Sequence, residues 1–259
     1  QAISGYLVSA DPVMRQLLID YSKGIVALFQ GMVWDNGVPE TESIMARAIF
    51  THNHDYTSDD GRKVSVDYDP MKLEEKYDWN AHTVPNPANP FFGSIWIRNM
   101  RSKDDVPHIF RIYPLLLRVV QDSQDDEVRA AAQDAVDHLR AFARDIVDNG
   151  YRIRTMEDGV AYVPSEDLAS FVQYEALVPN AECNAKLTTA LIAERAALGN
   201  DCGAGISTTY ESIAASIHYF NLAIIRFFHL AAITNALATR QNTIAKALLD
   251  GLVERVDVM

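Results

Sequence analysis

The sequence predicts an all-α protein built from antiparallel helical hairpins, and three features support this. Apolar residues recur at spacings of three and four over long stretches, which is the pattern of one buried helix face. Clusters of glycine, asparagine and aspartate follow these stretches and predict the helix ends. The chain of 259 residues, 48% of them hydrophobic, contains no nucleotide-binding glycine loop and no heptad array. One core and a single helical domain over residues 1–259 are therefore expected.

The first long helix is predicted from Val13 to Met32. Asp11 precedes it as a cap, and Pro12 fits its first turn. The Asp-Asn-Gly run at 35–37 stops it. A shorter helix is predicted from Glu42 to Phe50.

Residues 51–98 are predicted to form one long irregular loop, inserted into the helical domain. Pro85, Pro87 and Pro90 lie within six residues and forbid a helix there. The alternating run Val64–Tyr68 predicts a short strand, and strands are expected only in this region. A loop of this length is usually functional or disordered, and six of its aromatic side chains in particular argue against disorder. They are Tyr56, Tyr68, Tyr77, Trp79, Phe91 and Phe92.

Helices dominate the rest of the chain. The Asp-Asn-Gly run at 148–150 ends one of them, and the segment 199–205 separates two others. The predicted helices cover residues 106–121, 126–149, 167–175, 182–198, 207–238 and 242–256.

The charge of the chain restricts its partners. A formal net charge of −12 repels nucleic acid and anionic membrane surfaces. A neutral polar ligand such as a saccharide, or another protein chain, fits better.

No stretch predicts a transmembrane helix, because the most apolar one, 222–233, carries Arg226 and His229 and is shorter than the roughly 20 residues required. The chain begins with Gln1, which a removed export signal or trimming explains, and we expect an extracellular, periplasmic or cell-surface protein.

Cys183 and Cys202 are the two cysteines of the chain. Both lie at predicted helix ends beside polar loops, which favours a disulfide closing a loop of about 20 residues. The alternative is a pair of buried thiols.

The run from His52 to Asp55 is the best candidate for a metal site. Histidines two apart on an extended chain, His52 and His54, point the same way and can chelate zinc with Asp55 or Asp60 as a third ligand. The oxygen-rich stretch 55–69 suits calcium instead. The third interpretation is a solvated polar loop without an ion, so no cofactor is required.

The predicted helix 207–238 carries a polar line on a largely apolar surface. Glu211, His218 and His229 fall within roughly 20° of one another on a helical wheel, and Asn221 lies close to them. Either each histidine satisfies a local hydrogen bond, or the line faces a cavity and binds a polar ligand.

A dense polar run precedes the predicted helix 106–121. Asp104 and Asp105 are catalytic candidates, because a carboxylic acid beside arginines and an imidazole has the composition of general acid catalysis. Helix capping explains the same two aspartates without any catalysis. We expect the aspartates and His108 to line one cavity with His218 or Asn221. The candidate substrate-binding residues are Arg98, Arg101, His108, Arg111, Tyr113, His218 and Asn221.

Three of these stretches resemble the α/α-toroid, or six-hairpin glycosidase-like, proteins of bacteria. They are residues 101–113, residues 125–159 and the run His218–Ala223. The resemblance covers about residues 100–240 and implies alternating inner and outer helices with a polar mouth at one end of the ring. A complete ring of twelve helices needs more residues than this chain has, so an open or partial toroid is expected. The resemblance also implies activity on carbohydrate in many, though not all, such proteins.

Two functions from different classes therefore stay open. The first is an exported carbohydrate-active enzyme, a glycoside hydrolase or lyase, with its site at the helix mouths. The second is a non-catalytic exported surface, assembly or binding protein that uses the 51–98 loop as an interaction surface. The first needs two carboxylates about 5 to 10 Å apart in a concave site, and the second needs an exposed apolar patch.

Overall fold

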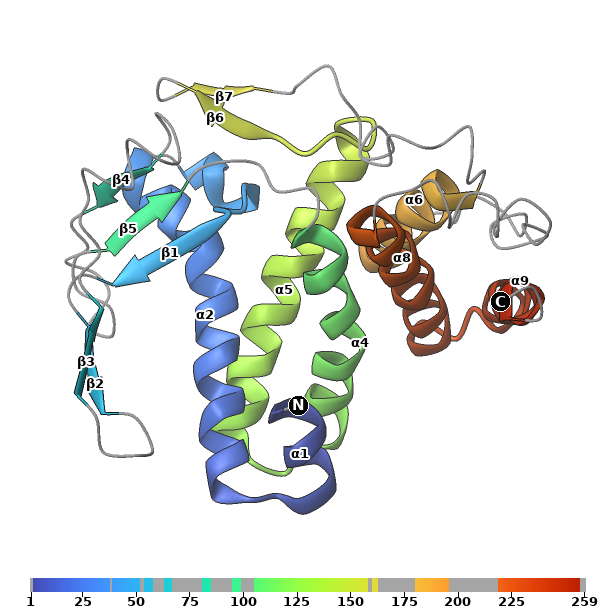
Figure 1. Cartoon of the computed structure of the whole chain (residues 1–259), viewed down its shortest axis with the longest axis horizontal. Helices are drawn as coiled ribbons and strands as arrows, with labels where there is room; N and C mark the ends of the chain where they lie inside the picture. Colours follow the sequence, from blue (N-terminus) through green and yellow to red (C-terminus); the bar gives the residue numbers. More distant parts are fainter. Residues whose placement is uncertain are drawn as a thin grey trace. The chain divides into compact units, whose positions relative to one another are not determined.

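Helices dominate the computed structural model, which confirms the all-α prediction (Figure 1). The structure describes residues 2–37, 39–51, 54–57, 63–66, 81–84, 95–98, 105–157, 160–162, 180–195 and 219–256. In these ranges the helices are α1 (Ala2–Ser9), α2 (Pro12–Asn36), the 3₁₀ helix η1 (Pro39–Ser43), α4 (Asp105–Asp122), α5 (Asp126–Asp148), α6 (Asn180–Ile192), α8 (Tyr219–Ala238) and α9 (Asn242–Val256). None of the described helices is long and apolar enough to cross a membrane. The closed or open ring of a toroid stays a prediction.

The chain divides into two compact units. The first contains α1, α2 up to Lys23, α4, α5, α6, α8 and α9, and the second contains α2 from Gly24, η1 and all the described strands.

In the first unit, α4 and α5 form a hairpin joined by residues 123–125. The side chain of Asp125 caps α5, because its Oδ1 accepts hydrogen bonds from the backbone N–H groups of Glu127 (3.1 Å) and Val128 (3.2 Å). Gly150, with φ +67°, ends α5 in the left-handed conformation that glycine adopts without strain. The buried face of α4 is Val106, Phe110, Tyr113, Leu116 and Val119.

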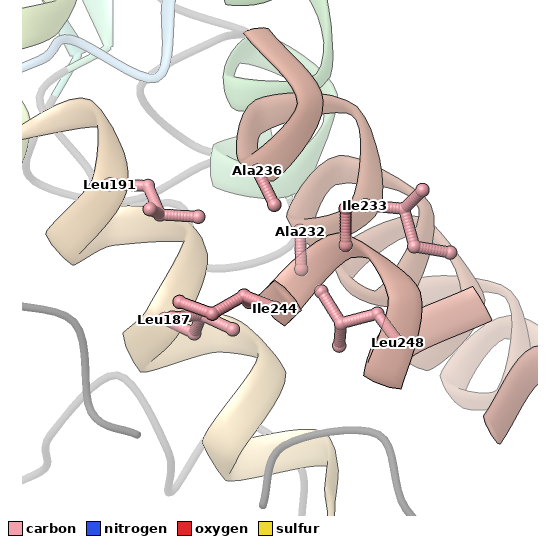
Figure 2. Close-up of a cluster of buried hydrophobic side chains, with 8 residues drawn as sticks. Leu187, Leu191, Ala232, Ile233, Ala236, Ile244 and Leu248 are labelled. Atoms are coloured by element: carbon pink, nitrogen blue, oxygen red, sulfur yellow. The ribbon is translucent and has the colours of Figure 1, made fainter. Parts of the chain in front are cut away.

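A second set of helices packs around α8, which contacts α4, α6 and α9. Leu187 and Leu191 of α6 point toward Ala232 and Ala236 of α8, whose small side chains let the helices approach closely (Figure 2). Ile233 of α8 and Ile244, Ala245 and Leu248 of α9 complete this cluster. Each buried leucine or isoleucine contributes about 1.5–3 kcal/mol relative to exposure. The α8–α9 hairpin turns at Arg240, whose φ of +59° matches the left-handed position after a helix.

The second unit contains short antiparallel strands. The three-stranded sheet has the order β1 (Ala48–Thr51), β5 (Ile95–Arg98) and β4 (Ala81–Val84), with Phe50 opposite Trp96. Two hairpins accompany it, β2 (His54–Thr57) with β3 (Lys63–Val66), and β6 (Thr155–Glu157) with β7 (Val160–Tyr162). The core of this unit is Met32, Ile44, Ala46 and Ile97, with Trp34 and Ile49 packed against it.

Three expectations need correction here. The helix predicted from Glu42 to Phe50 is wrong, because that stretch holds the end of η1 and the start of β1. The apolar residues Ile49 and Phe50 are compatible with a helix or with a strand. This segment is a strand because it pairs with β5. The strand predicted at Val64 is confirmed as β3, but β6 and β7 lie outside the region to which strands were expected to be confined. The helix predicted to end at 198 ends at Ile192.

Candidate functional site

The predicted catalytic residue Asp105 lies in the first turn of α4 and is half-buried. His108 and Arg111 follow at three-residue spacings on the exposed outer face of the same helix. Residues three apart on a helix are neighbours, so a carboxylate, an imidazole and a guanidinium lie in a row on the first two turns. Asp104 and Arg101 lie outside the described residues, and only the backbone of Arg98 is described, in β5.

Tyr113 lies on the opposite face of α4 and is buried. It is separated from His108 by roughly 140° around the helix axis, so the two side chains do not face one ligand. Arg140 of α5 donates a hydrogen bond from Nη2 to the Tyr113 hydroxyl oxygen (3.1 Å). Burial raises the pKa of this hydroxyl, against the opposing effect of Arg140. The hydroxyl is therefore protonated at neutral pH.

The remaining predicted ligand-binding residues lie on α8 or before it. Asn221 belongs to α8, but its side chain and the whole of His218 lie outside what the structure describes. Asp105 and His108 belong to α4, and α4 packs against α8, the helix that contains Asn221. His229 is fully buried, and its Nε2 lies 2.8 Å from the carbonyl oxygen of Leu248 on α9. His229 therefore makes a hydrogen bond, as the first of the two interpretations expects, but the partner is on another helix, so the bond joins α8 to α9.

The predicted metal site and disulfide fall largely beyond the described ranges. His54 and Asp55 belong to β2, whereas His52 is not described. Among the described residues no group of three histidine, cysteine, aspartate or glutamate side chains could hold a metal ion. Zinc or calcium in the 52–69 segment stays a prediction. Cys183 belongs to α6 and Cys202 is not described, so the disulfide also stays a prediction.

Sequence reasoning missed a polar network between α5 and the end of α6. Arg140 and Arg144, one turn apart on α5, both contact the carboxylate of Glu194, at 3.1 Å from Oε1 and 2.8 Å from Oε2. The Nε of Arg144 also donates to the carbonyl oxygen of Ala193 (3.3 Å), which satisfies an unpaired carbonyl at the end of α6. Two arginines four residues apart in a predicted helix were the sequence signal for this network.

Glu194 itself has an unusual backbone. Its φ is +56°, in the left-handed region, and it takes the position after α6 that glycine usually occupies. The N–H groups of Glu194 and Arg195 donate to the carbonyl oxygens of Leu191 (3.3 Å) and Ala190 (3.0 Å). A residue with a Cβ costs about 1–2 kcal/mol in this conformation relative to a right-handed one.

A largely buried ion pair lies at the end of α5. The Nε of Arg154 donates to both carboxylate oxygens of Asp145, at 2.8 and 3.0 Å. Burial nevertheless raises the pKa of Asp145. The hydrogen bonds and the charge of Arg154 lower this pKa, but by less than burial raises it. Nearby Asp148 adds to the increase and pairs with Arg195.

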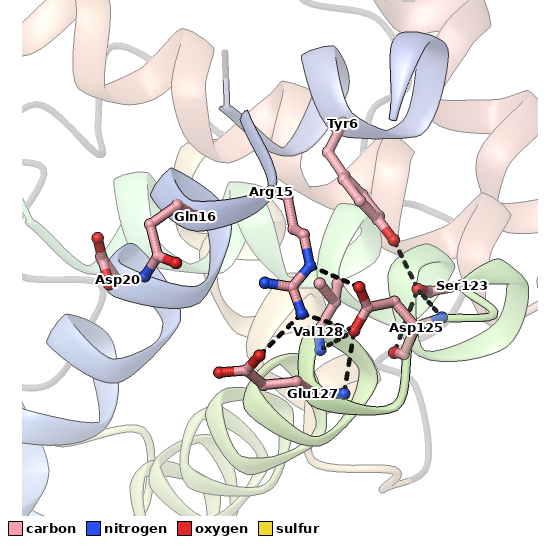
Figure 3. Close-up of polar contacts among 8 residues, drawn as sticks. All are labelled: Tyr6, Arg15, Gln16, Asp20, Ser123, Asp125, Glu127 and Val128. Carbon is pink, nitrogen blue, oxygen red and sulfur yellow. Dashed lines mark hydrogen bonds and ion pairs between the residues drawn. The ribbon is translucent and has the colours of Figure 1, made fainter. Parts of the chain in front are cut away.

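The beginning of α5 is held by a second network (Figure 3). Arg15 of α2 donates from Nε to Oδ2 of Asp125 (2.5 Å) and from Nη2 to Oε2 of Glu127 (2.8 Å). Hydrogen bonding by Arg15 lowers the pKa of Asp125 to about 2. Beside Asp125, the hydroxyl oxygens of Tyr6 and Ser123 lie 2.9 Å apart, within hydrogen-bonding distance. These contacts tie α1 and α2 to the α4–α5 turn.

No protein-family model, curated protein or solved structure matches this chain significantly. The chemistry of its own side chains is therefore the basis for assigning a function.

Proposed function

We propose that this protein is a carbohydrate-active enzyme, resembling glycoside hydrolases or lyases, with its active site at the beginning of α4. The observation that carries the proposal is the row formed by Asp105, His108 and Arg111 on the first two turns of that helix. In this role Asp105, or Asp104 before it, donates a proton to the leaving oxygen as the glycosidic bond breaks, and a second carboxylate accepts the proton of the water that attacks the sugar carbon. His108 and Arg111 donate hydrogen bonds to hydroxyl groups of the substrate.

The packing of α4 supports a defined geometry for this row. Val106 and Phe110 are fully buried on the other face of the same turns, and the rings of Phe110 and Phe142 lie 5.8 Å apart. Catalytic groups need to be held within a fraction of an ångström, and a packed helix holds them better than a loop. The net charge of −12 favours a neutral substrate over a polyanion.

The experiment is a comparison of aspartate variants on one helix. Asp104→Asn and Asp105→Asn are measured beside Asp122→Asn, which removes an exposed carboxylate that pairs with Arg118 at the far end of α4. With neutral polysaccharides as substrates and reducing-end release as the readout, we expect Asp104→Asn or Asp105→Asn to lower kcat by about 10²–10⁴-fold. Asp122→Asn should retain activity. Full activity in both N-terminal variants, with unchanged helical circular dichroism, contradicts the proposal.

One observation favours the second function, an exported binding or assembly protein. Leu230 and Leu237 of α8 and Leu249 of α9 are exposed leucines in the first unit. Leu230 and Leu237 are seven residues apart and therefore lie on the same face of α8, and an exposed apolar face of a helix is a candidate protein-binding surface. Leu237→Ser would then weaken association with a protein partner without affecting any turnover, whereas Asp105→Asn would leave that association unchanged.

A further inference from the structure

The network between α5 and α6 has the composition of a carboxylate-binding site. Arg140 and Arg144 lie one turn apart, and each directs one Nη2 group at a different oxygen of the same carboxylate. Like charges at this spacing on a helix repel each other, and a carboxylate between them relieves the repulsion. Arginine is well suited to this, because its planar donors match the two oxygens of a carboxylate.

Arg140 is held in place by groups other than Glu194. Its Nη2 also donates to the hydroxyl of the buried Tyr113, and its Nη1 lies 3.5 Å from Oδ1 of Asp137. Its side chain is only 22% exposed. The guanidinium therefore keeps its orientation when the carboxylate of Glu194 is absent, which is the condition for a preorganised binding site.

Glu194, by contrast, is the exposed member of the network. Its side chain is 53% exposed and that of Arg144 is 44% exposed, so solvent reaches both the carboxylate and one of its two donors. Ion pairs of this exposure contribute little to stability. A dissolved carboxylate can replace that of Glu194 and accept the same hydrogen bonds.

We propose that Arg140 and Arg144 form a binding site for a small organic carboxylate, which Glu194 occupies when no ligand is bound. Glu194 thereby acts as an internal competitor, because the ligand binds only to the fraction of molecules in which its side chain has moved away. The site uses none of the residues of the proposed carbohydrate site and does not depend on that proposal.

The test uses glucuronate as the probe and glucose, at equal ionic strength, as its neutral counterpart. Isothermal titration of the full chain compares wild type with Glu194→Ala and Glu194→Gln. We expect glucuronate to bind Glu194→Ala at least tenfold more tightly than it binds wild type. The affinity for glucose should be the same in both proteins. Adding Arg144→Met to Glu194→Ala should remove the gain, since one of the two donors is lost.

Two results overturn this inference. The first is equal affinity of glucuronate for wild type and Glu194→Ala, and the second is a gain that survives Arg144→Met. If Glu194→Ala does not fold, Glu194→Gln provides the same comparison, because its amide keeps the size of the side chain and removes the charge. Asp105→Asn should leave glucuronate binding unchanged, which separates this site from the proposed carbohydrate site.

Discussion

Asn235 of α8 donates a hydrogen bond from Nδ2 to the backbone carbonyl oxygen of Phe110 in α4, at 3.1 Å. Within a regular helix that carbonyl would accept from the N–H of residue 114, but Pro114 stands there and has no N–H. Asn235 is fully buried and supplies the missing donor from the neighbouring helix. An interior proline in α4 is thus accommodated by a polar residue 125 positions away in the chain.

The first prediction tests this compensation with a double-mutant cycle. Asn235→Ala should lower the free energy of unfolding by about 2 kcal/mol, because a buried carbonyl loses its donor. In a Pro114→Ala background residue 114 regains an N–H, so the cost of Asn235→Ala should fall by about 1 kcal/mol. Chemical denaturation of the four proteins measures this coupling. Thr234→Ala is the control, because Thr234 on the same helix bonds only to carbonyls of its own helix. Equal costs in both backgrounds would show that the two residues do not compensate each other.

The second prediction compares two glycines of α2. A Cβ on Gly24 would meet no atom within 4 Å, whereas a Cβ on Gly31 would lie 3.0 Å from Cδ1 of the buried Ile97. Gly24→Ala should therefore raise the free energy of unfolding by about 0.5–1 kcal/mol, through better helix propensity alone. Gly31→Ala gains the same propensity but overpacks the core around Ile97, and we expect a net loss of about 1 kcal/mol. Urea denaturation midpoints compare the stabilities of the two variants with that of wild type. A Gly31→Ala variant more stable than wild type would contradict the close approach between residue 31 and Ile97.

The third prediction concerns the acid sensitivity of the turn before α5. The pKa of Asp125 is about 2 in the folded chain, against an ordinary value of 3.8. The ionised carboxylate therefore stabilises the fold fully above the ordinary value, and this contribution is lost as the pH falls through about 2. Asp125→Asn keeps an N-cap but loses the charge that Arg15 binds. Its melting temperature should lie below that of wild type at pH 6 and converge with it near pH 2. A pH-independent difference would mean that the ion pair is not its cause.

The fourth prediction concerns the ion pair of Asp145 and Arg154. The pKa of Asp145 is already raised, so its contribution to stability falls as the pH rises through that pKa. Arg154→Met removes the partner that opposes the increase and should raise the pKa further. We expect a loss of up to about 3 kcal/mol at pH 7 and a smaller loss at pH 4, where the carboxyl is closer to neutral.

Arg195→Met is the matched control for that experiment. Arg195 pairs with Asp148, and both side chains are about half exposed. Such a pair contributes about 0–1 kcal/mol, so the control should lose little at either pH. If Arg154→Met also loses the same amount at pH 4 and pH 7, ionisation of Asp145 is not the source of the loss.

Local signals were sufficient for the start of α2 and for the bounds of α5. Asp11 caps α2 as predicted, because its Oδ1 accepts from the N–H groups of Val13 (2.9 Å) and Met14 (3.1 Å). The end of α5 at the Asp-Asn-Gly run was also correct. Capping and helix termination depend on residues within one turn of each other, so the sequence contains all the information that decides them.

Less of the candidate site than of the helices could be predicted from the sequence. The row of Asp105, His108 and Arg111 on the first turns of α4 follows from their spacing alone. The burial of Tyr113 does not, because burial of one helix face depends on what packs against it. The partners of Arg140 and Arg144 could not be foreseen either, since Glu194 lies 50 residues beyond Arg144.

The sequence by itself thus determined where α2, α4, α5 and α9 begin and end, and which charged groups lie side by side on them. Only the tertiary structure decided that residues 48–51 form a strand, that Tyr113 is buried and that Asn235 supplies a hydrogen bond to α4. The physical reason is the range of the interactions involved. Capping and helix periodicity act within a few residues, whereas strand pairing, burial and the satisfaction of buried polar groups depend on segments that only folding brings together.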